Sequence, residues 1–240
     1  MKKKIFALVL CIAMLAIAVG GTLAYFTDND AKTNVFTVGN IAIDLYETFN
    51  EAAEEMIPAV IVDKDDGSQE FRNALQKEVY IENTGSQEAW VRVHIAVPAV
   101  NDNGYFIGQF GQQDEAIKLI KGAEDWNWNV SAEDGAAENM YDSFNIEGIP
   151  YKAYVATCNT KLIAGVNTTA ALDKVYMNSY LTQDMIDWLN GEFGEAWTNV
   201  YVFAEAVQAD GFDDPFTAFD AAFEDVGTYE IDWTAVGEGD

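Results

Sequence analysis

Hydrophobic and polar residues alternate along much of the chain, a pattern typical of β-strands with one buried face. The clearest predicted strands are residues 41–46, 77–82, 88–97, 149–157, 199–208 and 230–233. In the strand 88–97 the valines take one phase while Arg92 and His94 take the other, so we expect its second face to be solvated. The strand 199–208 is apolar on both faces, which predicts a central position in its sheet.

Two connections follow from the same pattern. Residues 77–82 and 88–97 flank Asn83-Thr84-Gly85-Ser86-Gln87, which predicts a hairpin with a glycine-containing loop. Residues 51–69 are acidic and lack a clear period, so we expect mostly a surface loop there.

Two helices are predicted among the strands. Thr182 can cap a helix over residues 183–190, with Gly191 as its end. Asp214 followed by Pro215 is a strong start signal for the second helix. Three aromatic residues share one face of that helix, which we expect to pack on the core: Phe216, Phe219 and Phe223.

Many short strands with few helices predict an all-β fold with minor helices, built as an antiparallel β-sandwich. The chain has 240 residues, which suits one β-sandwich domain preceded by a short leader.

The N-terminal region has the parts of a secretory signal peptide. Lys2-Lys3-Lys4 precede an apolar run from Ile5 to Val19, and small residues follow up to Ala24. This run is shorter than the roughly 20 residues that a membrane-spanning helix needs. We therefore expect residues 1–24 to be a signal peptide, so that the protein is exported and meets the membrane only through the uncleaved signal.

The sequence around the predicted cut resembles the TasA/camelysin family, secreted proteins of Gram-positive bacteria that a dedicated signal peptidase of the SipW type cleaves. The resemblance rests on Gly20-Gly21-Thr22-Leu23-Ala24-Tyr25-Phe26-Thr27-Asp28 and on Asn34-Val35-Phe36-Thr37-Val38-Gly39-Asn40-Ile41-Ala42-Ile43-Asp44-Leu45. A weaker likeness extends through residues 82–86, 89–93 and 207–212, and residues 102–141 stay unmatched.

The resemblance implies cleavage between Ala24 and Tyr25, a single TasA-like domain over residues 25–240, and jelly-roll-like connectivity. TasA-like proteins form extracellular fibres in the biofilm matrix, and such fibres can grow when the mature N-terminus of one subunit adds as a strand to the next. In this chain Tyr25, Phe26, Thr27 and Asp28 are the candidate donor segment. The sequence equally allows these residues to form the first strand of their own domain.

The chain is strongly acidic. Its net charge is −27, and loss of residues 1–24, which carry three lysines and no acid, would bring it to −30. Such a surface repels nucleic acid and anionic lipid, so neither is an expected partner. Solubility outside the cell is the favoured explanation, with cation binding or polyanion-like matrix behaviour as the alternatives.

Camelysins are described as metallopeptidases, and catalytic zinc usually has three protein ligands and an open position. Once the leader with Cys11 is lost, the chain keeps one histidine, His94, and one cysteine, Cys158, and it has no His-Glu-x-x-His motif. We interpret His94 as a solvated strand residue and Cys158 as a buried apolar residue that cannot form an intramolecular disulfide. A Gly-x-Ser-x-Gly motif is also missing, so we expect no enzyme activity.

Two acidic stretches loosely resemble calcium loops: Asp63-Lys64-Asp65-Asp66-Gly67 with Glu70, and Asp28-Asn29-Asp30. Neither has the ligand spacing of an EF-hand, so we favour solvated turns and expect no cofactor. Trp126 and Trp128 flank Asn127 and are the candidate residues for glycan binding if they are exposed, although core burial is the commoner fate of tryptophan.

The sequence therefore predicts a secreted structural protein of the extracellular or biofilm matrix or the cell surface. Its expected partners are further copies of itself, the SipW-type peptidase and other matrix components. Two alternatives stay open, a camelysin-like metallopeptidase and an extracellular module that binds glycans or a host surface.

Overall fold

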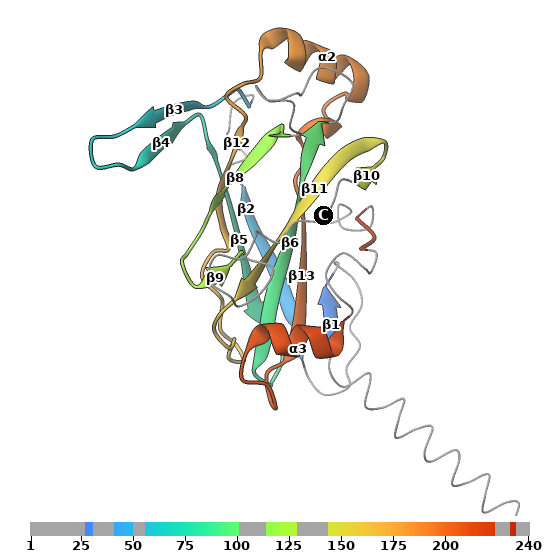
Figure 1. The fold of residues 1–240 in the computed structure, drawn as a ribbon. Helices are drawn as coiled ribbons and strands as arrows, with labels where there is room; N and C mark the ends of the chain where they lie inside the picture. Colours follow the sequence, from blue (N-terminus) through green and yellow to red (C-terminus); the bar gives the residue numbers. More distant parts are fainter. Residues whose placement is uncertain are drawn as a thin grey trace, which may run out of the picture.

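A computed structural model gives the fold of the chain (Figure 1). It describes residues 27–30, 41–49, 56–100, 114–128, 144–223 and 231–233. Strands dominate these residues and pair antiparallel in two large sheets and one small one. The predicted all-β, sandwich-like fold with minor helices is confirmed. Within the described ranges, no helix is long and apolar enough to cross a membrane.

The larger sheet is called the β6 sheet after its central strand. Its strands lie in the order β1 (Thr27–Asp30), β13 (Tyr201–Gln208), β6 (Ala89–Val100), β11 (Ile149–Cys158) and β10 (Phe144–Ile146). Two short strands extend it, β7 (Asp114–Glu115) beside β6 and β9 (Trp126–Asn127) beside β11. Strand β13 has a neighbour on each side, which confirms the central position predicted for residues 199–208.

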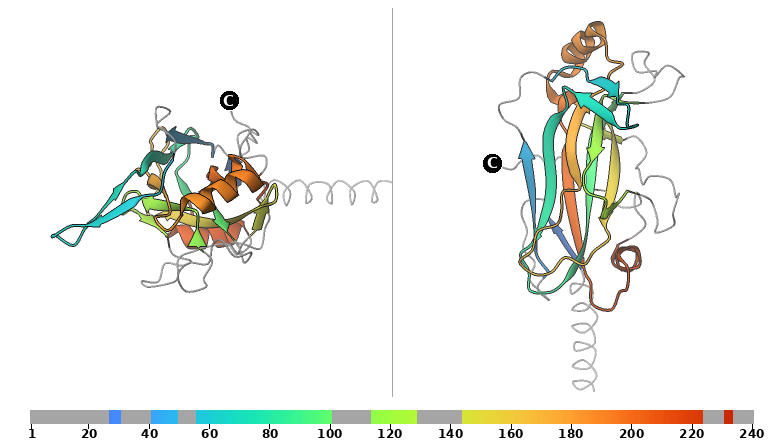
Figure 2. Two further views of the ribbon diagram at one scale, coloured as in Figure 1. Left: turned by 90° about the horizontal axis from the view of Figure 1, so that it is seen from above. Right: turned by 90° about the vertical axis from the view of Figure 1, so that its left-hand side faces the viewer.

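The second large sheet is called the β5 sheet. Its order is β2 (Ile43–Phe49), β5 (Leu75–Asn83), β12 (Leu172–Met177) and β8 (Ile117–Lys121). The small sheet, β3 (Val60–Asp63) with β4 (Gln69–Arg72), projects from the body of the molecule (Figures 1 and 2). Helix α2 (Gln183–Phe193) and the 3-10 helix η1 (Ala196–Thr198) lie toward one end of the sandwich, and α3 (Pro215–Ala222) lies toward the other.

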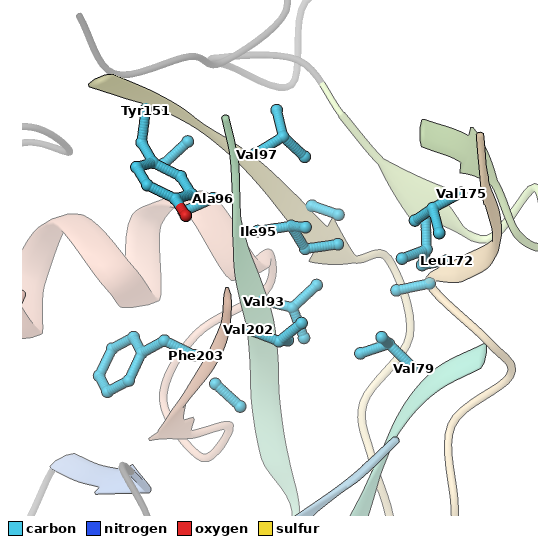
Figure 3. Close-up of a cluster of buried hydrophobic side chains, with 14 of the residues drawn as sticks. Val79, Val93, Ile95, Ala96, Val97, Tyr151, Leu172, Val175, Val202 and Phe203 are labelled. Atoms are coloured by element: carbon cyan, nitrogen blue, oxygen red, sulfur yellow. The ribbon is translucent and has the colours of Figure 1, made fainter. Parts of the chain in front are cut away.

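Side chains from the two facing sheets form the core (Figure 3). Val93, Ile95 and Val202 come from the β6 sheet, and Val79 and Val175 come from the β5 sheet. Each of them is at most 3% exposed. Full burial of one such aliphatic side chain stabilises the fold by roughly 1.5–3 kcal/mol, so this layer holds the two sheets together.

The hairpin predicted from residues 77–82 and 88–97 is wrong, because β5 and β6 belong to different sheets. The amide of Asn83 donates to the backbone oxygens of Gln87 (2.7 Å) and Leu162 (2.8 Å). These bonds hold the connection as an arch between the sheets. After β6 the chain continues to alternate between the sheets: β8 lies in the β5 sheet, β11 in the β6 sheet, β12 in the β5 sheet and β13 in the β6 sheet. Such alternation is typical of a jelly-roll-like sandwich.

Helix α2 begins where the sequence predicts and ends three residues later. The Thr182 hydroxyl accepts a hydrogen bond from the backbone N–H of Met185, as an N-cap does. Gly191 lies inside the helix, and Gly194 ends it with a φ of 64° that glycine adopts readily.

Helix α3 begins where the sequence predicts. The Asp214 carboxylate accepts from the backbone N–H of Thr217 (2.9 Å), and Pro215 follows at the first helical position. Phe219 is buried and Phe223 stacks on it, with ring centroids 6.0 Å apart, whereas Phe216 is half-buried. The aromatic face of α3 therefore does pack inward.

Two other expectations are corrected. Residues 51–55 lie outside the described ranges, and β3 with the start of β4 occupies much of the predicted loop over 51–69. Residues 231–233 form no strand, although Trp233 is buried and stacks on Phe144 at 5.6 Å between ring centroids.

Candidate functional site

Thr27 and Asp28, two of the four residues predicted to donate a strand, lie at the edge of their own β6 sheet (Figure 1). Strand β1 pairs antiparallel with β13, from Thr27 opposite Val207 to Asp30 opposite Ala204. Thr27 and Asp28 of the predicted donor segment are therefore in a strand of this chain. Tyr25, Phe26 and the predicted cut after Ala24 lie outside the described residues.

Strand β13 is buried along almost its whole length. Residues 202–208 are all buried, which leaves both faces of the strand covered. Without β1, the backbone N–H and C=O groups along one side of β13 would be left unpaired next to this apolar surface. Such an edge strongly favours the addition of a strand. We call the place that β1 occupies beside β13 the β1 slot.

Three charged or titratable side chains meet on the outer face of the β6 sheet, beside the β1 slot. The Glu205 carboxylate on β13 accepts from Arg92 Nε at 2.5 Å and contacts His94 Nε2 at 2.9 Å. Arg92 lies opposite Glu205 in the strand register, and Asn29 of β1 lies opposite Glu205 on the other side. We call Arg92, His94 and Glu205 the buried triad, because none is more than 4% exposed.

Helix α3 helps to exclude water from the triad. The guanidinium of Arg92 lies over the rings of Phe219 and Phe223, 4.3 and 5.4 Å from their centroids. The ring of Phe203 lies against His94, with 5.7 Å between centroids. A cation stacked on aromatic faces and paired with a carboxylate is a stable way to bury charge.

Burial and the charges within the triad shift the pKa values of His94 and Glu205. Burial lowers the pKa of His94, against the attraction of Glu205, so the imidazole favours its neutral form. Burial by itself would raise the pKa of Glu205, but His94 and the Arg92 guanidinium outweigh it and lower that pKa to about 2. Arg92 therefore keeps the Glu205 carboxylate ionised, and His94 is a second hydrogen-bond partner of that carboxylate.

The prediction of a solvated His94 is wrong, since its side chain is fully buried. Strand alternation placed His94 correctly on the face opposite the core valines, but it could not show that a further layer covers that face. The sequence did indicate that the aromatic face of α3 packs against the protein. It did not indicate which strand of the sheet that face would contact. The prediction that Cys158 is buried is confirmed, and burial raises the pKa of its thiol.

The described residues do not fit a catalytic zinc ion. His94 Nε2 is engaged with Glu205, and the thiol of Cys158 is buried beside Thr160. No group of three or more His, Cys, Asp or Glu side chains that could hold a metal ion occurs in the described ranges. Zinc hydrolysis needs several ligands and an open coordination position, and this arrangement offers neither.

The acidic stretch 63–67 forms the turn of the β3–β4 hairpin. Asp66 accepts from the backbone N–H and the hydroxyl of Ser68, at 2.9 and 2.6 Å. Glu70 pairs with Arg72 and with Lys64. The carboxylates at this place thus stabilise a turn, as predicted. The turn predicted for Asp28-Asn29-Asp30 is wrong, because these residues lie in strand β1 and pair with β13.

Trp126 and Trp128, the candidate glycan-binding residues, are only 4% and 6% exposed. Trp126 Nε1 donates to the backbone oxygen of Thr169 (3.1 Å), and Lys121 covers the ring of Trp128 (5.4 Å). A cavity of about 180 Å³ lies beside Trp128 and is bordered by Glu115, which Lys118 and Tyr154 contact. The open aromatic platform that glycan binding requires is therefore not formed by these two rings.

Two buried polar atoms near the end of β13 make no hydrogen bond in the described part of the chain, Trp90 Nε1 on β6 and Gln208 Oε1 on β13. Trp90 lies opposite Val207 in the strand register, and its ring is covered by Lys161, whose Nζ is 5.3 Å from the ring centroid.

Residues 1–92 of the chain match the model of a family described as camelysin metallo-endopeptidase. A search of curated proteins and a search of solved structures found no match. The matched region ends at Arg92 in β6, so it includes the predicted signal peptide and strands β1 to β5 but not His94, Cys158 or Glu205. The match supports the TasA/camelysin assignment.

Proposed function

We propose that this chain, which its first 92 residues assign to the TasA/camelysin family, is an exported structural protein that assembles by exchange of its N-terminal strand. The observation that carries the proposal is the β1 slot. Four residues directly after the predicted donor aromatics pair with the edge of a strand that is otherwise buried.

Strand exchange follows from the position of β1 in the sheet. An edge strand of four residues forms few hydrogen bonds, so it can be replaced by the same segment of another copy without disturbing the core. The replacing strand makes the same backbone bonds in the same register. Because the donor segment and the slot are different surfaces, the contact is head-to-tail, and repeated exchange gives a filament when the rotation between copies does not close a ring.

Export and cleavage would control this exchange. While the signal peptide is attached, the donor segment is held next to the membrane and cannot reach the slot of another copy. Cleavage between Ala24 and Tyr25 would free it. N-terminal sequencing of the secreted protein should therefore read Tyr-Phe-Thr-Asp, and a start ten or more residues away would contradict this route.

The assembly test compares the secreted protein with a variant that lacks Tyr25 to Asp30. We expect the secreted protein to form filaments in electron micrographs and the variant to stay a folded monomer with an unchanged circular dichroism spectrum. A peptide of residues 25–32 should block filament growth, whereas a scrambled peptide of the same composition should not. Filaments from the truncated variant, or none from the secreted protein under any condition tried, would overturn the proposal.

The family description favours a second function, a metallo-endopeptidase. The buried triad argues against it, because His94 is committed to Glu205 and excluded from water. We expect the secreted protein to leave casein intact. Cleavage that stops on addition of a chelator and stops again in a folded His94→Ala variant would establish the peptidase instead.

A further inference from the structure

The cavity beside Trp128 lies between the two large sheets, and we call it the Trp128 cavity. Strands β7 and β11 of the β6 sheet contribute to its wall, and so do β8 and β12 of the β5 sheet. Its residues do not include any from β1 or β13. The cavity is therefore separate from the β1 slot.

Apolar and aromatic side chains form much of the wall. Ile117 and Leu119 of β8 contribute aliphatic surface, and three aromatic rings accompany them: Trp128, Tyr154 and Tyr176. The volume of the cavity is about 180 Å³. A cavity of about 150 Å³ holds one benzene molecule, so this space suits a single aromatic ring with a small substituent.

Hydrogen-bond donors exceed acceptors among the polar side chains at the cavity. The Glu115 carboxylate accepts from Lys118 (3.1 Å), Lys152 (3.4 Å) and the hydroxyl of Tyr154. Each ammonium group has three N–H donors, and one carboxylate offers about four lone-pair sites for all of them. The buried indole Nε1 of Trp128 makes no hydrogen bond within the described ranges. A ligand that supplies acceptors therefore suits this wall better than one that supplies donors.

Positive charge gathers at the cavity although the whole chain is strongly acidic. Lys118, Lys121 and Lys152 are three of the 13 lysines and arginines in a chain of net charge −27. Lys121 is exposed and lies over the ring of Trp128, so its charge is at a part of the wall that water reaches. Glu115 is the acidic residue of the wall, and the three lysines outnumber it. The local charge thus favours an anion.

We infer that the Trp128 cavity binds a small aromatic carboxylate, a single ring that carries one carboxylate group. The ring lies against Tyr154, Tyr176 and Trp128, and the carboxylate accepts from the ammonium groups of Lys118 and Lys121. Hydrogen bonds between two charged groups are about twice as strong as those between neutral groups, so the lysines supply much of the selectivity.

The first test compares three probes by isothermal titration calorimetry of the secreted protein. Benzoate has both the ring and the charge, benzamide has the ring alone, and acetate has the charge alone. We expect benzoate to bind roughly tenfold more tightly than either of the others. Equal affinity for benzoate and benzamide, equal affinity for benzoate and acetate, or no binding of benzoate up to about 10 mM would overturn the inference.

The second test locates the binding with two variants that remove the same charge from neighbouring strands. Lys121→Gln changes the wall of the cavity. Lys174→Gln on β12 is the control, because Lys174 pairs with the exposed Asp173 at 3.7 Å and does not line the cavity. A third variant, Lys121→Arg, keeps the charge at the wall.

We expect benzoate to bind roughly tenfold more weakly to Lys121→Gln and to keep its affinity within about twofold for Lys174→Gln and Lys121→Arg. Thermal melting should show that all three variants remain folded. Equal weakening by Lys121→Gln and Lys174→Gln would show a general attraction of anions to lysines and would overturn the assignment to this cavity. Because β1 contributes nothing to the wall, the result does not depend on whether the protein forms filaments.

Discussion

Glu205 and Glu70 each accept a hydrogen bond from an arginine Nε, at 2.5 and 3.1 Å, in opposite surroundings. Glu205 is buried with Arg92, whereas Glu70 and Arg72 are exposed to water. Glu205→Gln should destabilise the fold by about 3–5 kcal/mol, because it leaves a buried guanidinium without its counter-charge. Glu70→Gln should leave the unfolding free energy nearly unchanged, because water solvates the freed arginine. Urea titrations measure the unfolding free energies of the two variants. Equal changes in Glu205→Gln and Glu70→Gln would mean that the triad is open to solvent.

The triad also sets a pH dependence at the residue scale. The pKa of Glu205 is about 2 in the folded chain against an ordinary value of 4.5, so its stabilisation is present above pH 4.5 and is lost as the pH falls toward 2. The pKa of His94 is lowered from 6.5, so its contribution is present above pH 6.5 and declines below it. Urea titrations between pH 7 and pH 3 should show that Glu205→Gln reduces the loss of unfolding free energy below pH 4.5, while Asp66, Glu70 and Asp214, whose pKa values are also lowered, keep a part of it. An unchanged slope in the variant would contradict this assignment.

At the scale of single elements, two glycines should respond to the same change with opposite sign. Gly122 follows β8, and a Cβ there would lie 2.0 Å from the backbone oxygen of Ala170, so Gly122→Ala should destabilise the fold by about 1–3 kcal/mol. Gly191 lies inside α2 with nothing within 4 Å of the added Cβ, so Gly191→Ala should stabilise by about 0.5–1 kcal/mol. Thermal melting of the two variants checks both signs. A stabilising Gly122→Ala would mean that β8 does not pack against the segment before β12.

At the scale of the whole molecule, net charge should govern the proposed assembly. Carboxylates keep copies apart at neutral pH, so both added salt and mild acid should speed filament growth, salt by screening and acid by neutralisation. At pH 5 Glu205 stays ionised, so its pair with Arg92 persists while surface repulsion falls. Light scattering against salt at pH 7 and against pH at fixed salt separates the two causes. Growth that is insensitive to both would show that charge does not limit assembly.

Local signals in the sequence determined most elements of this protein. The cap at Thr182, the Asp214-Pro215 start of α3 and the apolar strand 201–208 all depend on neighbouring residues, and the structure places them as predicted. The sandwich class followed from the same alternation. The resemblance to the TasA/camelysin family rests on contiguous residues near the N-terminus, so it needs no knowledge of packing.

Tertiary structure alone decided which strands are neighbours and which faces are covered. Residues 77–82 and 88–97 are close in sequence, yet β5 and β6 lie in different sheets, where apolar side chains from both strands form one core, and the Asn83 bonds stabilise the arch between them. His94 has the sequence pattern of a solvated residue, yet it is buried against Phe203 and Glu205, more than 100 positions later in the chain, and beside Arg92, which the aromatic residues of α3 cover. The slot beside β13 likewise arises from residues far apart in the chain. Pairing and burial depend on contacts between distant segments, whereas hydrophobic periodicity and capping depend only on near neighbours.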